Sequence, residues 1–376
     1  MSQATLYLGL MSGTSIDSID AAAVSFDQGQ LKLLGTYTHP ISDALRLNIL
    51  NLSQPGLDSV QLYGETDHLL GHLFADAALA LMASLSIGPD DIVAIGSHGQ
   101  TIRHSPPKTN SIAFSQQIGD ANIIAARTGC SVVSDFRRKD VALGGHGAPL
   151  VPAFHYSLFS HPQRQRVIAN IGGIANITVL PPDGACYGFD TGPGNLLLDA
   201  WCKRHTGKLY DDKGAWGATG QVDAALLKQL KTHPFLGLEA PKSTGREEFN
   251  LAWLESILTD HSLPPENVQA TLTAFTAQTL GDAISALDDN IDEVYVCGGG
   301  AFNNQLMARL EETLPGSVVS TTDDLGLAPS WVEACAFAWL ARQRVLSLPG
   351  NLPRVTGASI VFHLFWSLAP STESGV

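Results

Sequence analysis

The sequence has little positive charge for its length. Its 22 lysine and arginine residues are outnumbered by 36 aspartate and glutamate residues, which gives a formal net charge of −14. Nucleic acids and anionic membranes are bound through clustered basic side chains, so this balance argues against both as partners. A phosphate-bearing ligand stays compatible with it, because backbone N–H groups bind anions locally whatever the net charge.

Cysteines and long apolar runs are also scarce. The five cysteines are scattered, odd in number and without a CxxC pair, which disfavours a disulfide framework or a zinc site and suits reduced thiols. No basic segment followed by a long apolar run opens the chain, so no signal peptide is evident. The apolar stretch 360–369 is too short to span a bilayer. We therefore expect a cytoplasmic protein.

Hydrophobic residues and glycines are abundant instead. A chain of 376 residues with 44% hydrophobic and 15% charged residues indicates a compact protein, with two domains as the default. Many of the 36 glycines fall in short motifs. Apolar residues at helical spacing predict core-facing helices over 60–85, 268–287 and 331–345.

The first glycine motif, residues 9–20, joins two predicted strands. An apolar run over 6–10 leads into a Gly/Ser/Thr turn, and a second apolar run follows over 21–26. The backbone N–H groups and hydroxyls of such a turn can bind an anion, and Asp17 and Asp20 could hold a hydrated metal ion. An ordinary polar hairpin turn explains this stretch equally well.

Two later glycine turns have a similar setting. Residues 170–176 join apolar runs at 167–169 and 177–180, which repeats the strand–turn–strand pattern and suggests a duplicated architecture. The three glycines 298–300 lie between a predicted strand and a helix. Glycines at such a position let a ligand approach the backbone, although a plain connection is the alternative.

Polar residues follow several of the predicted strands. Ser97 and His98 come after a strand over 92–96, where open α/β sheets bind ligands, although His98 could be purely structural. Arg137 lies in a basic cluster that could bind a carboxylate or phosphate or form a solvated turn. Asp190 follows a strand over 186–189 and precedes a Thr/Gly/Pro turn and a helix, where a functional carboxylate or a mere turn residue is expected.

Together these motifs resemble the superfamily of sugar kinases, heat-shock chaperones and actin. Within it, the chain is similar over most of its length to the anhydro-N-acetylmuramic acid kinase family. The stretches that carry the resemblance are 9–20, 96–103, 117–122, 134–152, 170–178, 188–199, 211–214, 241–249 and 297–303.

The resemblance implies an α/β fold of two ribonuclease-H-like (actin-like ATPase) domains with an ATP cleft between them. It places the first domain at 1–135 plus about 346–376 and the second at 136–345. It also implies ATP and Mg²⁺ as cofactors, a small sugar as substrate and a homodimer.

The resemblance further assigns roles to residues. Asp190 matches the catalytic base, and Asp17 and Asp20 are candidates for Mg²⁺. The implied ATP-binding residues are Gly13, Thr14, Ser15, Ile16, Asp17, Ser18, Ile19, Asp20, Gly172, Gly173, Asn176, Gly298, Gly299, Gly300 and Asn303. The implied substrate-binding residues are Ser97, His98, Arg137, Gly192 and Asn195.

The implied reaction uses ATP and water to open the 1,6-anhydro ring of anhydro-N-acetylmuramic acid and to phosphorylate O6. The products are N-acetylmuramic acid 6-phosphate and ADP, and the reaction serves peptidoglycan recycling. Two alternatives stay open: a kinase of another amino sugar on the same fold, and a non-catalytic ATP-binding protein related to actin or the chaperones.

Two features depart from the family pattern. Ser18 stands where the first phosphate loop usually has glycine, and a side chain there would shift the loop if φ were positive. The aromatic-rich tail from Ser359 to Val376 does not match the family's usual ending.

Overall fold

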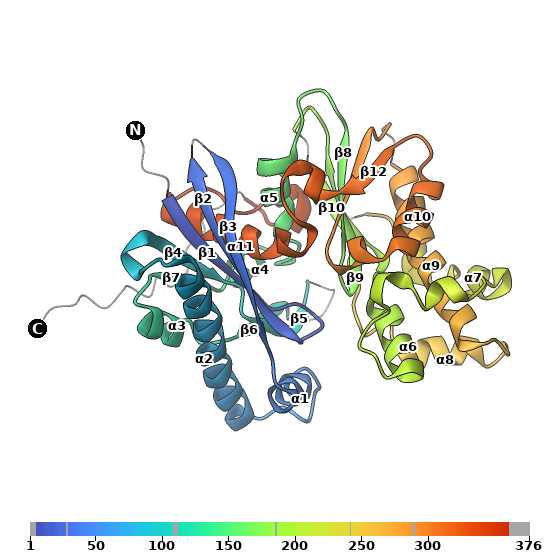
Figure 1. Cartoon of the computed structure of the whole chain (residues 1–376), viewed down its shortest axis with the longest axis horizontal. Coiled ribbons are helices and arrows are strands. Elements are labelled where there is room, and N and C mark those ends of the chain that lie inside the picture. Colours follow the sequence, from blue (N-terminus) through green and yellow to red (C-terminus); the bar gives the residue numbers. More distant parts are fainter. Residues whose placement is uncertain are drawn as a thin grey trace, which may run out of the picture. The chain divides into compact units, whose positions relative to one another are not determined.

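The computed structural model describes residues 5–27, 29–107, 112–184, 186–240, 242–287 and 290–360. These residues form two α/β units (Figure 1). Unit 1 holds the described residues up to Leu158 together with those from Trp331 onward, and unit 2 is Phe159–Ser330. The aromatic-rich tail from Ser359 to Val376 is described only as far as Ile360, so the rest of it lies outside the described residues.

Unit 1 is built around a five-stranded sheet with the strand order β3-β2-β1-β4-β7. Strands β1, β2 and β3 pair antiparallel, whereas β4 pairs parallel with β1 and β7 pairs parallel with β4. The bounds are β1 Thr5–Met11, β2 Ser18–Asp27, β3 Gln30–Pro40, β4 Ile92–Ser97 and β7 Val132–Val133. Every residue from Leu6 to Leu10 is buried, which is expected of a central strand.

Helices and a β-hairpin complete unit 1. They are α1 Asp43–Leu52, α2 Val60–Leu85, α3 Ala121–Thr128, α4 Arg138–Ala142, α5 Val151–Phe159 (all but its last residue), α11 Val332–Val345, α12 Pro353–Thr356 and the hairpin of β5 Gln100–Ser105 with β6 Phe114–Ile118. Two glycines let α11 pack closely on the sheet, because a Cβ on Gly9 would overlap Ala334 O and one on Gly96 would overlap Phe337 O. The predicted helices over 60–85 and 331–345 are confirmed.

Within the described residues, α2 is one helix that is long and apolar enough to cross a membrane by length and composition alone. Its N-cap Ser59 accepts a hydrogen bond from Leu62 N. Its buried residues, among them Phe74 and Leu81, belong to the same apolar cluster as Leu8 and Leu10 of β1. This packing is that of a core helix, whose apolar stripe faces a sheet.

Unit 2 contains a second five-stranded sheet with the order β10-β9-β8-β11-β12. Strands β8, β9 and β10 pair antiparallel, and β11 pairs parallel with both β8 and β12. The bounds are β8 Arg166–Ile171, β9 Ile174–Leu180, β10 Tyr187–Pro193, β11 Glu293–Cys297 and β12 Val318–Thr321. The antiparallel–antiparallel–parallel–parallel order is that of unit 1, so the predicted duplicated architecture is confirmed.

The helices of unit 2 are α6 Leu196–Thr206, α7 Ala224–Leu230, α8 Leu251–Leu258, α9 Pro265–Ser285 and α10 Asn304–Thr313. Helix α9 joins two apolar clusters. Leu280 and Ile284 pack with the strands of the sheet, whereas Leu272 and Phe275 pack with α6, α7 and α8. Because α9 packs against both clusters, it is buried on nearly all sides.

The α/β fold with two sheet-containing units is the fold class predicted from the sequence. The compact units divide the chain after Leu158 and Ser330, whereas the predicted domains divide it after 135 and 345. Aromatic contacts explain why the intervening segments group with unit 1, because Phe154 of α5 lies 6.0 Å from Trp339 of α11, ring to ring. The predicted ATP cleft stays a prediction.

Candidate functional site

The first glycine turn, residues 12–17, connects β1 to β2. Ile16 N–H donates to Gly13 O at 3.3 Å and closes the turn. The side chain of Ile16 is 4% exposed and packs in the core of unit 1, whereas Thr14 and Ser15 are exposed. The core side chain therefore anchors the turn while its hydroxyls face outward. Ile16, and likewise the buried Ile19, can offer a ligand only backbone groups.

Ser18 begins β2 and pairs with Pro40 of β3 in extended backbone. A serine side chain is unstrained in that conformation. The left-handed residue of the turn is Ile16, with a φ of 54°. The departure from the family pattern at Ser18 therefore carries no backbone penalty.

Two carboxylates flank this turn. Asp17 is exposed and accepts a hydrogen bond from Ser15 Oγ, and Asp20 accepts one from Thr38 Oγ1 at 2.9 Å. Burial raises the pKa of Asp20 and the Asp17 charge raises it further, while the Thr38 hydrogen bond lowers it. No group of three or more His, Cys, Asp or Glu residues suited to a metal ion occurs among the described residues. Mg²⁺ commonly binds through one or two carboxylates plus substrate phosphates, so this oxygen pair fits a metal ion that arrives with a nucleotide.

His98 lies just after β4 and is buried in unit 1. Its backbone N–H donates to Leu10 O at 2.9 Å, and its Nδ1 lies 2.8 Å from Gly99 O. Because a carbonyl oxygen only accepts, Nδ1 carries the proton and Nε2 is left as an acceptor. Burial and the Arg137 charge hold the pKa of His98 well below its usual value, so the ring is neutral.

Arg137, which precedes α4, uses that acceptor. Its Nε and Nη2 lie 3.2 and 2.9 Å from His98 Nε2, and its Nη1 donates to Gly147 O at 2.8 Å. Burial lowers the pKa of Arg137 to about 10, while Glu333 and Asp140 raise it. The guanidinium therefore stays charged at neutral pH. The structure brings together the predicted substrate residues His98 and Arg137.

Ser97, the third predicted substrate residue of unit 1, ends β4 beside Leu10 of β1. It is buried, and its Oγ has no hydrogen-bond partner among the described residues. A buried hydroxyl without a partner is costly unless water or a ligand satisfies it.

In unit 2, the second glycine turn is held by the segment that leads into α6. Asn195 N–H donates to Gly172 O at 2.8 Å, and Gly194 N–H donates to Gly173 O at 2.9 Å. Asn195 Nδ2 also donates to Ile171 O at 3.1 Å. Asn195, which was predicted to bind substrate, thus lies against the predicted phosphate turn.

The third glycine turn packs against the second. Gly298 has a φ of 78°, and a Cβ there would lie 2.5 Å from Asn170 Oδ1 and 2.8 Å from Ile171 O. Asn303 caps α10, since its Oδ1 accepts from Gln305 N and Leu306 N at 3.1 Å each. The structure therefore gathers 170–173, Asn195 and 298–300 into one backbone-lined region of unit 2. Asn176 lies farther along β9, opposite Asn170 and Asp190.

Asp190 lies inside β10, which continues to Pro193, and not after a strand end as the sequence suggested. Its backbone N–H donates to Lys242 O at 3.1 Å, and its Oδ2 accepts from Thr244 N–H at 3.0 Å. Burial raises the pKa of Asp190 to about 7, with a further increase from Glu247 and a decrease from the Thr244 hydrogen bond. A carboxyl group with this pKa is suited to accept and release protons near neutrality.

The segment 242–244 is a part of this site that the sequence did not assign. Lys242 Nζ donates to Phe235 O at 3.3 Å and Leu236 O at 3.2 Å, which ties the segment to the body of unit 2. Leu236 also lies beside the predicted substrate residue Gly192, whose φ is 148°. In the sequence, this segment is marked only by the resemblance of 241–249 to the family, which gives no role to any single residue.

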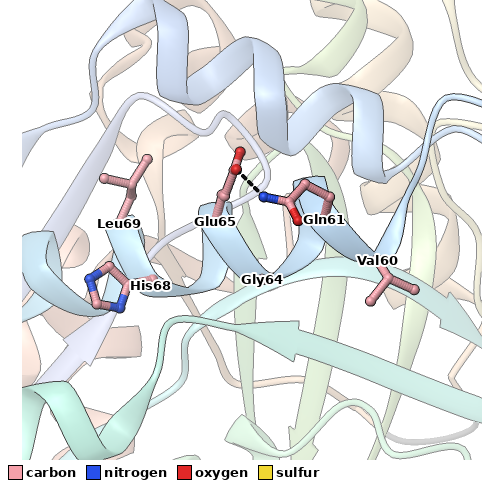
Figure 2. A pocket seen from close by; sticks show the side chains of 6 residues that line it. All are labelled: Val60, Gln61, Gly64, Glu65, His68 and Leu69. Carbon is pink, nitrogen blue, oxygen red and sulfur yellow. Dashed lines mark hydrogen bonds between the residues drawn. The ribbon is translucent and has the colours of Figure 1, made fainter.

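An open surface depression of about 540 Å³ lies elsewhere, on α2 of unit 1. Figure 2 shows its lining, in which Gln61 Nε2 donates to Glu65 Oε1. The lining residues are Val60, Gln61, Gly64, Glu65, His68 and Leu69. None of the predicted site residues is among them, so the depression is separate from the candidate site.

The family model for anhydro-N-acetylmuramic acid kinase matches residues 5–366. The chain belongs to this family. Anhydro-N-acetylmuramic acid kinases from Shewanella loihica and Photobacterium profundum are 51% and 50% identical to it, each over 94% of this chain and over 95% and 96% of their own lengths. The anhydro-N-acetylmuramic acid kinase of Pasteurella multocida is 50% identical over 97% of both chains. The family identified from the motifs is thus confirmed. Its match ends at residue 366, so it includes the first residues of the tail from Ser359 that was expected to depart from the family pattern.

Among solved structures, component A of (R)-2-hydroxyglutaryl-CoA dehydratase from Acidaminococcus fermentans aligns over 89% of this chain and 96% of that chain. The TM-score is 0.46 and the sequence identity is 12%.

Proposed function

We propose that the chain uses ATP and water to convert 1,6-anhydro-N-acetylmuramic acid into N-acetylmuramic acid 6-phosphate and ADP, in peptidoglycan recycling. The observation that carries the proposal is Asp190, a carboxyl group whose pKa is about 7 and whose Oδ2 is fixed by Thr244 N–H. Opening of the anhydro ring needs a base to activate water, and this group supplies one near neutral pH.

Asp190 acts as the general base in this proposal. It takes one proton from a water molecule, whose oxygen then bonds to the anomeric carbon as the bond from that carbon to O6 breaks. The released O6 attacks the γ-phosphorus of ATP in line, and ADP leaves. The Thr244 N–H holds one carboxylate oxygen, so that the other is oriented to accept the proton. A separate protein acid is unnecessary because the phosphoryl group captures O6.

The three glycine turns would bind ATP. Backbone N–H groups and hydroxyls of residues 13–20 and of Gly172 and Gly173 suit the phosphates, and the 298–300 turn suits the nucleoside because glycines allow close approach. Asp17 and Asp20 would hold Mg²⁺, which neutralises phosphate charge when it is bound. These assignments rest on the family resemblance, on the exposed Thr14 and Ser15 of the first turn and on the glycines of the other two turns.

His98 and Arg137 would bind the sugar. Muramic acid carries a lactyl carboxylate, and a charged guanidinium is suited to such a group. Arg137 stays rigid because His98 and Gly147 hold it at 2.9 and 2.8 Å. The unpartnered Oγ of Ser97 would gain a hydrogen bond from the ligand or an ordered water. Gly192 and Asn195 would also bind the substrate, as the family resemblance implies.

We also place the enzyme in the cytoplasm, as a homodimer. Its five cysteines are buried and scattered along the chain without a CxxC pair, a pattern that suits reduced thiols in a reducing compartment.

Product analysis in labelled water tests the reaction. The protein is incubated with the anhydro sugar, Mg-ATP and ¹⁸O-water, and the product is examined promptly by mass spectrometry. We expect one added phosphate and one ¹⁸O atom in the sugar, with equimolar ADP. Phosphorylation of N-acetylglucosamine without turnover of the anhydro sugar would reject this substrate in favour of another amino sugar.

The pH dependence of turnover gives a second test. Because Asp190 must be deprotonated to act as a base, kcat/KM for the sugar at saturating Mg-ATP should rise with pH and level off above about 7. Below that value it should fall about tenfold per pH unit, as for a single essential group. Titration of ATP itself could give a similar slope, so the Asp190→Asn variant is measured in parallel and should lose the Asp190 component. A profile that is unchanged by the substitution would contradict the assignment.

A further inference from the structure

Asp140 is a fully buried acidic residue of α4 to which neither the motifs nor the family resemblance gave a role. Its Oδ2 accepts a hydrogen bond from Gly147 N–H at 2.7 Å. Its Oδ1 accepts from Thr356 Oγ1 at 2.7 Å and from Asn351 Nδ2 at 3.3 Å. A buried carboxylate is costly unless such donors satisfy it, so this site is built around the Asp140 side chain.

Gly147 links Asp140 to Arg137. While Asp140 binds the N–H of Gly147, Arg137 Nη1 donates to its carbonyl oxygen at 2.8 Å. Gly147 has a φ of 72°, and a Cβ there would lie 2.8 Å from Val141 Cγ2, so a side chain at this position would be strained. The N–H of Gly147 is thus bound by the Asp140 carboxylate and its carbonyl oxygen by the Arg137 guanidinium. Asp140 and Arg137 therefore contact the same residue.

The C-terminal part of unit 1 forms the other end of this network. Thr356 lies in α12, 216 positions after Asp140, and its carbonyl oxygen accepts from His146 N–H at 2.7 Å. Ser359 N–H donates to Leu143 O at 2.9 Å. The loop 143–147 is therefore held by α12 and its flanks as well as by α4.

We propose that Asp140 is a positioning residue for sugar binding, and that α12 acts through it to orient Arg137 and His98. The connection runs from Thr356 to Asp140, from Asp140 to Gly147, from Gly147 to Arg137, and from Arg137 to His98. The proposal rests on the proposed function, because it takes Arg137 and His98 as the sugar-binding residues.

Steady-state kinetics of Asp140→Asn and Thr356→Val test this connection. Thr356→Val keeps the side-chain shape and removes the hydroxyl that donates to Asp140 and accepts from Ala358 N–H at 3.5 Å. Asp140 keeps its Gly147 and Asn351 donors in this variant, so it is the milder of the two changes. We expect the KM for the anhydro sugar to rise at least tenfold in Asp140→Asn and at least threefold in Thr356→Val. The KM for ATP should stay within twofold, and Thr356→Ser, which restores the hydroxyl, should return the sugar KM to the wild-type value.

Thr66→Val is the matched control, since Thr66 is a buried threonine of α2 whose Oγ1 has no partner among the described residues. It should leave both KM values unchanged. A lower melting temperature in Thr356→Val without a change in sugar KM would show a purely structural role and overturn the proposal.

The ring nitrogens of His98 give a readout that needs no substrate. In ¹⁵N NMR spectra, with the His98 signals identified by their loss in His98→Gln, we expect Thr356→Val to shift the Nε2 signal and Thr66→Val to leave it in place. If the wild type neither binds nor converts the anhydro sugar, the proposed function fails, and this shift still decides the connection. An unshifted Nε2 signal would overturn it.

Discussion

Replacement of Asp190 by asparagine is expected to lower kcat for the anhydro sugar by about 10²–10⁴-fold, the usual contribution of a general base. The amide has the shape of the carboxyl group and its oxygen can still accept from Thr244 N–H, which is 3.0 Å from Asp190 Oδ2. What it loses is the ability to take a proton from water. The loss should therefore appear in turnover, while ATP affinity and melting temperature stay near those of the wild type.

Turnover of purified Asp190→Asn is measured with ATP affinity by calorimetry on the same sample. Asp282→Asn serves as the control, because Asp282 is an exposed acidic residue of unit 2 that forms an ion pair with Lys231 at 2.6 Å. It should retain full activity. If Asp190→Asn kept more than about a tenth of wild-type turnover while folded and binding ATP, the general-base role would have to be abandoned.

The strongly periodic segments and the glycine turns of this chain could be predicted from the sequence. Helix α2 has the bounds Val60–Leu85 that the spacing of its apolar residues predicted. The β1–β2 and β8–β9 turns could be placed because a glycine-containing polar stretch separates two apolar runs in each case. These signals are local: a core-facing helix or strand repeats its apolar residues at a fixed period, and a turn interrupts them.

Contacts between distant positions could not be predicted in this way. Asp190 and Thr244 are 54 positions apart, and the pKa of about 7 depends on the burial that their packing creates. The register also shifts between Asp190 and Gly192, which lets β10 continue where the sequence suggested a turn. Nothing local marks such a shift, because it depends on pairing with β9. The same limit applies to His98 and Arg137, which meet only once unit 1 has folded.

Replacement of Gly298 by alanine is the second change with a large expected effect. Its φ of 78° and ψ of −179° fall in a region that is essentially restricted to glycine, and a Cβ there would lie 2.5 Å from Asn170 Oδ1. Backbone strain of about 1–3 kcal/mol and overpacking of about 1–3 kcal/mol should lower the free energy of unfolding by roughly 2–6 kcal/mol together. The displaced Asn170 and Ile171 lead into the Gly172–Gly173 turn, so ATP affinity should fall at least tenfold.

The Gly326→Ala variant separates the effect of backbone strain from the effect of the close contact with Asn170. Gly326 also lies in unit 2 and has a φ of 84°, but its ψ of 12° is in the ordinary left-handed region and a Cβ there would meet nothing within 4 Å. Its replacement should cost only the left-handed penalty of about 1–2 kcal/mol and leave ATP affinity unchanged. Urea unfolding followed by circular dichroism and calorimetric ATP titration measure both variants. Only Gly298→Ala is expected to disturb the second glycine turn. If the two variants lost ATP affinity equally, the contact of Gly298 with Asn170 and Ile171 would have no part in nucleotide binding.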